Sequence, residues 1–327
     1  MKKINLFVAC LGCSLLLFHG LACKDAEMPP PLSPTEEWRR SAENPILRDP
    51  IPAANYQVAS DGHIFFEENG QLAMIYTGDT DGHASIKLAR GRSLTDWELD
   101  RSLLFELGPS QWDRHKETAF YRQTAAGKHQ IYYIGYPEED RYQAQVFLAE
   151  ADQLEGPYTQ SASPVVPRGN LAGKDVYCIT SPSVVAHEGL LYLTFLAWNA
   201  GPNEVTEVWA LGARSTDEGH TWSDFQLIDT PIGMEGQLTR RPTGDFVAVR
   251  TGPYGAAEAI FYATAPHPFG PWTTSEQPLL TPGGAPLETH EIIAPQITID
   301  PQSGEEYLFY TGADHQRGWW MMLAERP

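Results

Sequence analysis

The chain has 327 residues, of which 42% are hydrophobic, and a formal net charge of −19 at pH 7. Such an acidic balance argues against binding to nucleic acid or to an anionic lipid surface, because both are bound through Lys and Arg. The 28 glycines and 26 prolines predict many turns and few long helices.

The N-terminal residues 1–22 are predicted to be a signal peptide. Lys2 and Lys3 precede an apolar stretch, 4–21, which is short and poorly flanked for a membrane span. The small residues before Cys23 resemble a bacterial lipobox, so Cys23 is expected to be lipidated. An ordinary signal peptide followed by an incidental cysteine is the alternative.

The segment 23–43 is expected to be an extended tether, since it is rich in proline. Cys10 and Cys13 would be removed with the signal peptide and Cys23 lipidated, so Cys178 has no partner for an intrachain disulfide. The predicted location is the bacterial cell envelope, lipid-anchored to the outer membrane on its periplasmic or surface side.

Residues 44–327 contain five repeats of one pattern, in which an apolar strand reaches an alanine and a turn follows, often with an aromatic residue after it. The alanines are Ala89, Ala149, Ala213, Ala263 and Ala324. About four short strands per repeat predict an all-β, five-bladed β-propeller, with a twisted β-sandwich as the alternative. The last repeat lacks a fourth strand, so residues 44–48 are predicted to complete that blade and close the ring.

Several short motifs carry a family resemblance. They are residues 44–47, the Tyr-Thr-Gly strand ends at 76–78 and 310–312, and the turns at 154–158 and 269–272. Over residues 44–327 the chain resembles the five-bladed glycosidases of glycoside hydrolase family 43 and its relatives in families 32, 68, 117 and 130. Residues 215–222 also match the sialidase Asp-box, which is a structural hairpin in that family.

A glycosidase needs two carboxyl groups that face one sugar linkage. In a propeller the inner strands begin at one mouth of the central channel, and counting along the repeats gives five comparable positions. They are Asp61, Glu117, Ser181 (or Thr180), Glu235 and Ala294. A catalytic funnel is therefore predicted at this mouth.

The resemblance implies that Asp61 is the general base of an inverting enzyme and Glu235 the general acid. A turn aspartate and a solvated loop carboxylate are the respective alternatives. Glu117 is predicted to be a second acid or a sugar-binding carboxylate, or else a simple ion-pair partner of a neighbouring cation. The family's third carboxylate falls on Ser181, whose hydroxyl cannot supply the charge.

Other residues are expected to bind substrate in the funnel. They are Trp112, Arg114, His115, Ser181, Arg240, His290 and Glu291, with Tyr121, Tyr177 and Trp198 as further stacking candidates. Five of the basic residues form a set that suits a carboxylated or sulfated sugar or phosphate, and they are Arg114, His115, Lys116, Arg240 and Arg241. The alternative is that these residues form ordinary salt bridges.

The predicted function is hydrolysis of an oligo- or polysaccharide. The alternatives are a non-catalytic glycan-binding lipoprotein and a phosphate-dependent glycosidase similar to family 130. No metal-ligand spacing appears in the sequence and no cofactor is required, although the resemblance allows a calcium or sodium ion in the central channel. The expected partner is a carbohydrate, with membrane contact made through the lipid anchor.

Overall fold

The computed structural model describes residues 38–51, 57–105, 112–201, 204–228, 234–252, 259–314 and 316–326, without the side chains of 101–103 and 234–235. The predicted signal peptide, Cys23 and the start of the predicted tether lie outside this part. Every regular element within it is a β-strand. Among these residues there is no helix of the length and apolarity needed to cross a membrane.

Five antiparallel sheets, here called blades one to five, follow one another along the chain. Blade one contains β3 (Ser60–Phe66), β4 (Leu72–Thr80), β5 (His83–Gly91) and β6 (Trp97–Leu103), and blade two contains β7 (His115–Gln123), β8 (His129–Tyr136), β9 (Gln145–Ala151) and β10 (Thr159–Gln160). Blade three contains β13 (Cys178–His187), β14 (Leu190–Trp198), β15 (Val208–Ser215) and β16 (Ser223–Leu227), and blade four contains β17 (Met234–Arg240), β18 (Phe246–Gly252), β19 (Ala259–Ala265) and β20 (Thr273–Thr274). Blade five contains β21 (Glu291–Ile299), β22 (Glu306–Asp314) and β23 (Gly318–Glu325), and a hairpin of β11 (Gly169–Leu171) and β12 (Lys174–Val176) lies between blades two and three in the sequence.

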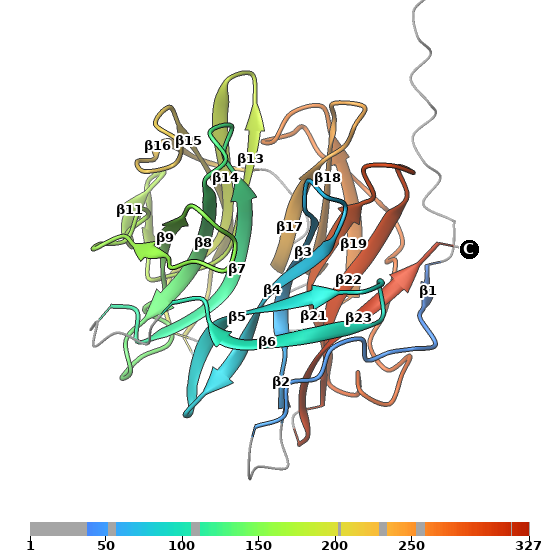
Figure 1. The fold of residues 1–327 in the computed structure, drawn as a ribbon. Coiled ribbons are helices and arrows are strands. Elements are labelled where there is room, and N and C mark those ends of the chain that lie inside the picture. Colours follow the sequence, from blue (N-terminus) through green and yellow to red (C-terminus); the bar gives the residue numbers. More distant parts are fainter. Residues whose placement is uncertain are drawn as a thin grey trace, which may run out of the picture. The chain divides into compact units, whose positions relative to one another are not determined.

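The first strands of the five blades form a closed inner ring. Contacts run from β3 to β7, then to β13, β17 and β21, and from β21 back to β3. The blades therefore surround one axis (Figure 1). The predicted five-bladed propeller is confirmed, and the sandwich alternative is wrong.

Apolar side chains fill the spaces between neighbouring blades. One buried cluster, for example, combines Phe120 and Tyr132 of blade two with Leu193 and Leu211 of blade three. Trp222, at the end of the turn that resembles an Asp-box, packs edge-on against Tyr132 at 6.0 Å between ring centres. That turn thus joins two blades, as a structural hairpin would.

Three blades also contain the same buried cluster of a tyrosine, an acidic residue and a basic residue. In blade one the Tyr76 hydroxyl donates to Asp49 (3.1 Å), whose carboxylate also accepts a hydrogen bond from the Lys87 ammonium (2.6 Å). The arrangement recurs as Tyr133, Asp113 and Lys116 in blade two and as Tyr310, Glu288 and Arg40 in blade five. Each buried acid therefore has both a cation and a hydroxyl donor, which such a charge requires in a protein interior.

The N-terminal part of the described chain closes the ring along β23. β1 (Arg39–Arg40) pairs antiparallel with β23, and β2 (Gln57–Val58) pairs with it in parallel. Between them Asn44 bonds both backbone groups of Leu323, with its amide as donor and its carbonyl as acceptor, each at 2.8 Å. Residues 44–48 thus lie beside β23 as predicted, but the regular strand is Arg39–Arg40. The propeller begins inside the segment that was predicted to be tether.

We expect the substitution Asn44→Ala to destabilise the propeller, because it leaves the N–H of Leu323 without its partner, while the C=O of Leu323 keeps the hydrogen bond from the Ser41 N–H. A loss of about 1–3 kcal/mol in the free energy of unfolding is expected, measured by urea denaturation. Asn69→Ala is the control, since the Asn69 side chain bonds an exposed hairpin amide. Equal effects of the two substitutions would contradict a role for Asn44 in closure.

Candidate functional site

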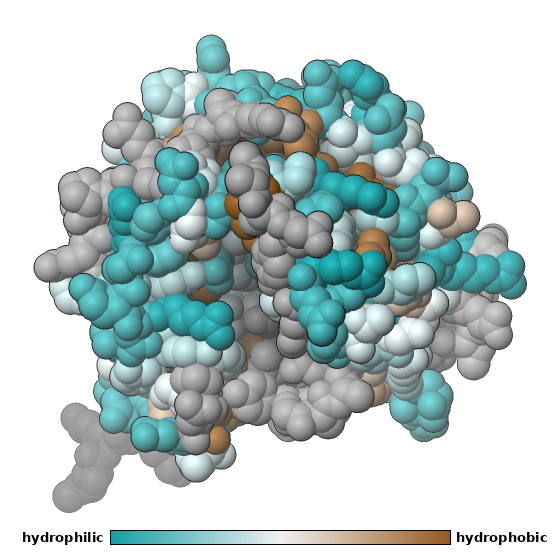
Figure 2. Space-filling model, turned by 90° about the horizontal axis from the view of Figure 1, so that it is seen from below, coloured by the Kyte–Doolittle hydropathy of each residue, from teal (hydrophilic) through white to brown (hydrophobic). Residues whose placement is uncertain are grey.

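A pocket of about 500 Å³ opens at the mouth of the channel where the inner strands begin. Its lining includes Asp61 and Thr77 from blade one, Glu117 and Tyr136 from blade two, and Trp198 from blade three. Ile293 and Trp319 from blade five line it as well. The face seen in Figure 2 is largely hydrophilic and hollowed near its middle. The volume suits a small ligand such as one or two sugar rings.

The inner strands share a local distortion at this mouth. A residue with left-handed backbone interrupts the strand pairing in four blades, and the four are Asp61, Thr118, Ser181 and Ala294. The residue before each of them still pairs with the second strand, as Ser60 does with Thr77 and Glu117 with Ile134. Such a bulge re-aims the neighbouring side chains, and here it does so around the channel axis.

Threonine hydroxyls hold two of these bulges from the preceding blade. The backbone N–H of Asp61 donates to Thr311 Oγ1 of blade five (2.9 Å), and that of Thr118 donates to Thr77 Oγ1 of blade one (3.0 Å). Each bulged N–H that is lost from the strand ladder is therefore satisfied across a blade boundary. The two bulges held in this way carry or adjoin Asp61 and Glu117.

Asp61 is a carboxyl group at 8% exposure in the pocket. Its Oδ2 accepts a hydrogen bond from the Ser60 hydroxyl at 2.8 Å. Burial, and then the charge of Glu117, raise the pKa of Asp61 from its ordinary 3.8 to about 7, although the hydroxyls of Ser60 and Thr77 oppose the increase. Asp61 can therefore take up or release a proton near neutral pH, as a general acid or base must.

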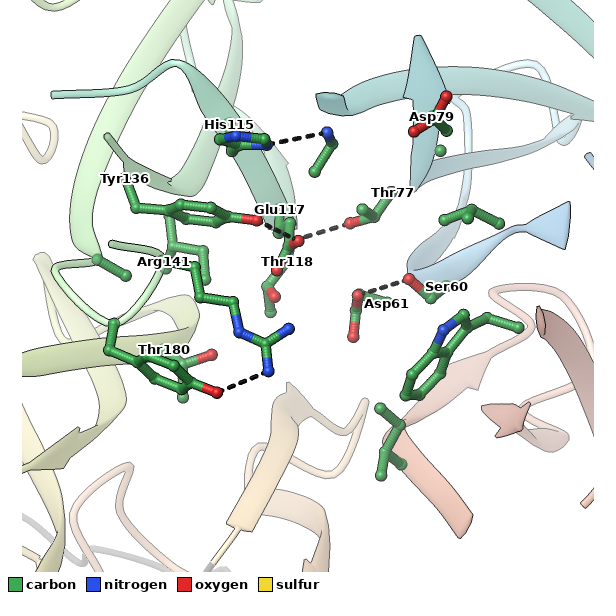
Figure 3. Close-up of a pocket in the computed structure, with 18 of the residues that line it drawn as sticks. Ser60, Asp61, Thr77, Asp79, His115, Glu117, Thr118, Tyr136, Arg141 and Thr180 are labelled. Atoms are coloured by element: carbon green, nitrogen blue, oxygen red, sulfur yellow. Dashed lines mark hydrogen bonds between the residues drawn. The ribbon is translucent and has the colours of Figure 1, made fainter. Parts of the chain in front are cut away.

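Glu117 faces the same pocket and has different partners (Figure 3). The Tyr136 hydroxyl donates to Glu117 Oε1 at 2.5 Å, and the guanidinium of Arg141 reaches into the pocket. Burial raises the pKa of Glu117, while the Tyr136 hydroxyl and the Arg141 charge oppose the increase. Both partners favour the ionised form of Glu117, and in that form its charge raises the pKa of Asp61.

The structure places the predicted carboxyl positions as follows. Asp61 and Ser181 occupy equivalent bulge positions, whereas Glu117 precedes the bulge of its blade, where Thr118 stands. The predicted equivalence of Glu117 with Asp61 is thus one residue off, although both line the pocket. Glu235 lies in β17 between the paired residues Met234 and Gly236, and its side chain is outside the described part. Its predicted role stays a prediction.

Among the predicted binding residues, His115 and Trp198 line the pocket. Glu291 begins β21, and its charge adds a small increase to the pKa of Asp61. His290 precedes it, and its backbone N–H donates to Ala313. Trp112, 44% exposed, and Arg114, whose Nε is 3.7 Å from Glu138, are not among the residues that line the pocket.

The predicted basic set does not come together. Arg240 lines a second pocket at the opposite mouth, as does the aromatic candidate Tyr121. Lys116 is buried against Asp113, and Arg241 forms an ion pair with Asp245. The alternative of ordinary salt bridges therefore describes Lys116 and Arg241 correctly. A further aromatic candidate, Tyr177, is not in the lining, and its hydroxyl donates to Asp140 at 2.5 Å.

Two residues that contact or approach Glu117 were missed from the sequence. Tyr136 ends β8, and Arg141 lies in the turn that follows, before β9. The Arg141 guanidinium also donates to the Tyr142 hydroxyl at 2.6 Å, which holds it against the pocket wall. A cation just after the second strand of a blade that carries a mouth carboxylate is the signal that could have identified it.

No family model matches the sequence, and no curated protein matches it. Solved structures share the fold. An N-acetylgalactosamine deacetylase from F. plautii in complex with blood group B trisaccharide has a TM-score of 0.68 at 14% identity, covering 88% of this chain and 94% of that one. An α-L-arabinofuranosidase from Podospora anserina in complex with cellotriose has a TM-score of 0.65 at 12% identity, covering 89% and 96%. A glycoside hydrolase family 43 enzyme from Xanthomonas citri complexed with xylotriose has a TM-score of 0.60 at 17% identity, covering 86% and 92%.

At these identities the likeness establishes the fold alone. The fold that was expected from the resemblance is confirmed, and the neighbours include carbohydrate-active propellers of more than one reaction type. The reaction of this chain must therefore be argued from its own pocket.

We expect Asp61→Asn to stabilise the protein at pH 8 and not at pH 4. The folded state raises the pKa of Asp61 from 3.8 to about 7, so it binds this proton up to a higher pH than the unfolded chain. The stability of the wild type therefore falls as pH rises through this window, by up to about 4 kcal/mol. Asn carries no charge and tolerates the left-handed backbone at this position.

Urea denaturation of both proteins at the two pH values measures this effect. Asp152→Asn is the control, because the Asp152 side chain is 89% exposed. An advantage of Asp61→Asn that does not depend on pH would show that the Asp61 carboxyl is not held at a raised pKa.

Proposed function

We propose that this propeller is a glycoside hydrolase that cleaves an oligo- or polysaccharide at the mouth lined by Asp61 and Glu117. The observation that carries the proposal is a buried carboxyl with a pKa near 7 beside a second carboxylate, in a pocket large enough for a sugar. Hydrolysis of a glycosidic bond requires two carboxyl groups whose pKa values differ. The pocket also offers Trp198 and Trp319 as stacking surfaces.

In this proposal Asp61 is the general base that activates water. A buried carboxylate with a raised pKa binds a proton more strongly than a solvated one, and this is what a base needs. Glu117 acts through its charge, which raises the proton affinity of Asp61. It thereby supplies an electrostatic contribution in a propeller where the family's third carboxylate is replaced by Ser181. Glu235 is proposed as the general acid, on the resemblance and on its position in β17.

The two alternatives have less support from the pocket. Phosphate-dependent cleavage needs cations around an anion, and Arg240 and Arg241 lie on β17 and just after it, with Arg240 in the second pocket. Arg141 is a cation that does reach the funnel, and it faces Glu117. A purely glycan-binding propeller would gain nothing from a buried carboxyl whose ionisation costs stability.

We further propose that Cys23 anchors the enzyme by a lipid at the outer membrane, facing the periplasm or the cell surface. The proline-rich segment that follows it would allow the propeller to reach polysaccharide fragments. Metabolic labelling with a fatty acid, compared with Cys23→Ser, tests the anchor separately from the activity.

A panel of aryl-glycosides, plant and algal oligosaccharides and N-acetylated sugars, incubated with and without phosphate, tests the reaction. We expect release of reducing sugar without phosphate, and a decrease in kcat/KM of about 10²–10⁴-fold in Asp61→Asn. Glu235→Gln should lose activity on natural linkages and retain it on substrates with activated leaving groups, which need no acid. Turnover that requires phosphate, release of acetate instead of sugar, or binding without turnover would each contradict the proposal.

The pH dependence of kcat/KM tests the role of Asp61. A base must be ionised, so activity is expected to increase as pH rises through about 7. Glu117→Gln removes a charge that raises the pKa of Asp61, so the increase in kcat/KM should occur at lower pH. Glu139→Gln is the control, because Glu139 is exposed, and it should leave the pH of this increase unchanged. Activity that falls through the same range would make Asp61 the acid and contradict this assignment.

A further inference from the structure

Three side chains from separate segments converge at the edge of the funnel. His83 begins β5, His115 begins β7, and Glu138 follows β8. Their ligand atoms all lie within 4.8 Å of one another. Gly82, Ala84 and His115 also line the funnel pocket, so the cluster borders the proposed active site.

The spacing of the three groups suits a tetrahedral metal ion. His83 Nε2 lies 3.1 Å and His115 Nε2 3.4 Å from Glu138 Oε2. Zinc binds histidine nitrogen and carboxylate oxygen at about 2.0–2.2 Å, which puts neighbouring ligand atoms about 3.3 Å apart. The two separations from Glu138 thus match those around a shared cation, and the two histidine nitrogens lie within 4.8 Å of each other.

The hydrogen bonds of His83 leave its metal-binding nitrogen available. Its Nδ1 lies 3.1 Å from the carbonyl oxygen of Asp81, an acceptor, so Nδ1 carries the hydrogen. In the neutral tautomer with this hydrogen, Nε2 carries a lone pair that faces the carboxylate of Glu138 at 3.1 Å, with two acceptors in contact. A cation between them removes this repulsion, and a histidine fixed by a backbone carbonyl is the usual support of a metal ligand.

His115 is held in place by two contacts. Its ring stacks on Tyr136 at 4.8 Å between centres and 6° between planes. Its Nδ1 accepts a hydrogen bond from the backbone N–H of Ala84 at 3.3 Å. Coordination through Nε2 moves the ring hydrogen to Nδ1 and ends this contact, at a cost of about 1 kcal/mol that a metal–nitrogen bond exceeds. The positive charge of Arg114, 3.7 Å from Glu138, also opposes the cation.

From this geometry we propose that His83, His115 and Glu138 bind a divalent first-row transition cation, with Zn²⁺ as the best match. Two imidazoles and one carboxylate favour such a metal over Ca²⁺ or Mg²⁺, which prefer oxygen ligands. Three protein ligands leave a fourth position open beside the funnel. An oxygen ligand, such as a hydroxyl or carboxylate of a bound sugar, fits there.

Metal binding to the full chain, without an affinity tag, tests the site independently of any activity. After treatment with a chelator, titration with ZnCl₂ is expected to show one equivalent bound, and Co²⁺ should give the visible absorption bands of a histidine-coordinated ion. His83→Ala and Glu138→Gln should each weaken Zn²⁺ binding at least about 10-fold. Asp61→Asn should bind Zn²⁺ like the wild type, so a failure of the proposed reaction and a failure of this site are distinguishable.

His220→Ala is the matched control, because His220 also faces a glutamate, Glu150 at 3.7 Å, without a second histidine. Circular dichroism checks that each variant is folded, and the 60% exposure of the Glu138 side chain makes Glu138→Gln a mild change. Absence of Zn²⁺ binding in the wild type would overturn the proposal and leave the contact of His83 with Glu138 as an ordinary hydrogen bond. Binding that His83→Ala and Glu138→Gln leave unchanged would place the ion elsewhere and overturn it equally.

Discussion

The mouth of this propeller depends on one backbone distortion, the left-handed residue at the start of the inner strands. An L-residue pays roughly 1–2 kcal/mol for this conformation, and aspartate pays less than threonine because its short polar side chain tolerates it. The distortion also removes an N–H from the strand ladder, and a buried N–H must find another acceptor. Thr311 and Thr77 provide that acceptor for Asp61 and Thr118. The geometry of these two mouth positions is therefore fixed by the preceding blade, and for Asp61 the contact with blade five requires the closed ring.

This dependence also couples the two carboxyl groups of blades one and two that line the pocket. The Thr77 hydroxyl both holds the bulge at Thr118 and lowers the proton affinity of Asp61, so one side chain links the two carboxyl positions. The equivalent Thr251 of blade four has a hydroxyl without a hydrogen-bond partner among the described residues. Among the described residues the Thr77 hydroxyl thus supports the bulge of the next blade, whereas the Thr251 hydroxyl does not. Burial of Asp61 costs stability, and the supported bulge is what keeps the carboxyl there despite that cost.

The repeats made the fold predictable from sequence, because each blade must bury the same apolar faces and so repeats the same pattern. The site was less predictable, for reasons that lie in the geometry. Counting residues from strand ends assumes regular pairing, and the bulge breaks it, so Glu117 was aligned with Asp61 although Thr118 is the true equivalent. Arg141 comes from a turn whose direction no periodicity describes. Strand Arg39–Arg40 lies before the first repeat, where a proline-rich tether was expected, and its pairing partner β23 is at the other end of the chain.

The histidine cluster was hidden from sequence for a related reason. Metal motifs are recognised by short spacing on one element, whereas His83, His115 and Glu138 lie on segments that only the packing of two blades brings together. That packing also connects the cluster to the carboxyl pair, since one face of Tyr136 stacks on His115 while its hydroxyl donates to Glu117. A cation bound by His115 would draw electron density from a ring that lies against Tyr136, and a stronger phenol donor would favour the ionised form of Glu117. The Glu117 charge, which adds to the effect of burial on the pKa of Asp61, would then be stabilised from the rim of the funnel through one aromatic side chain.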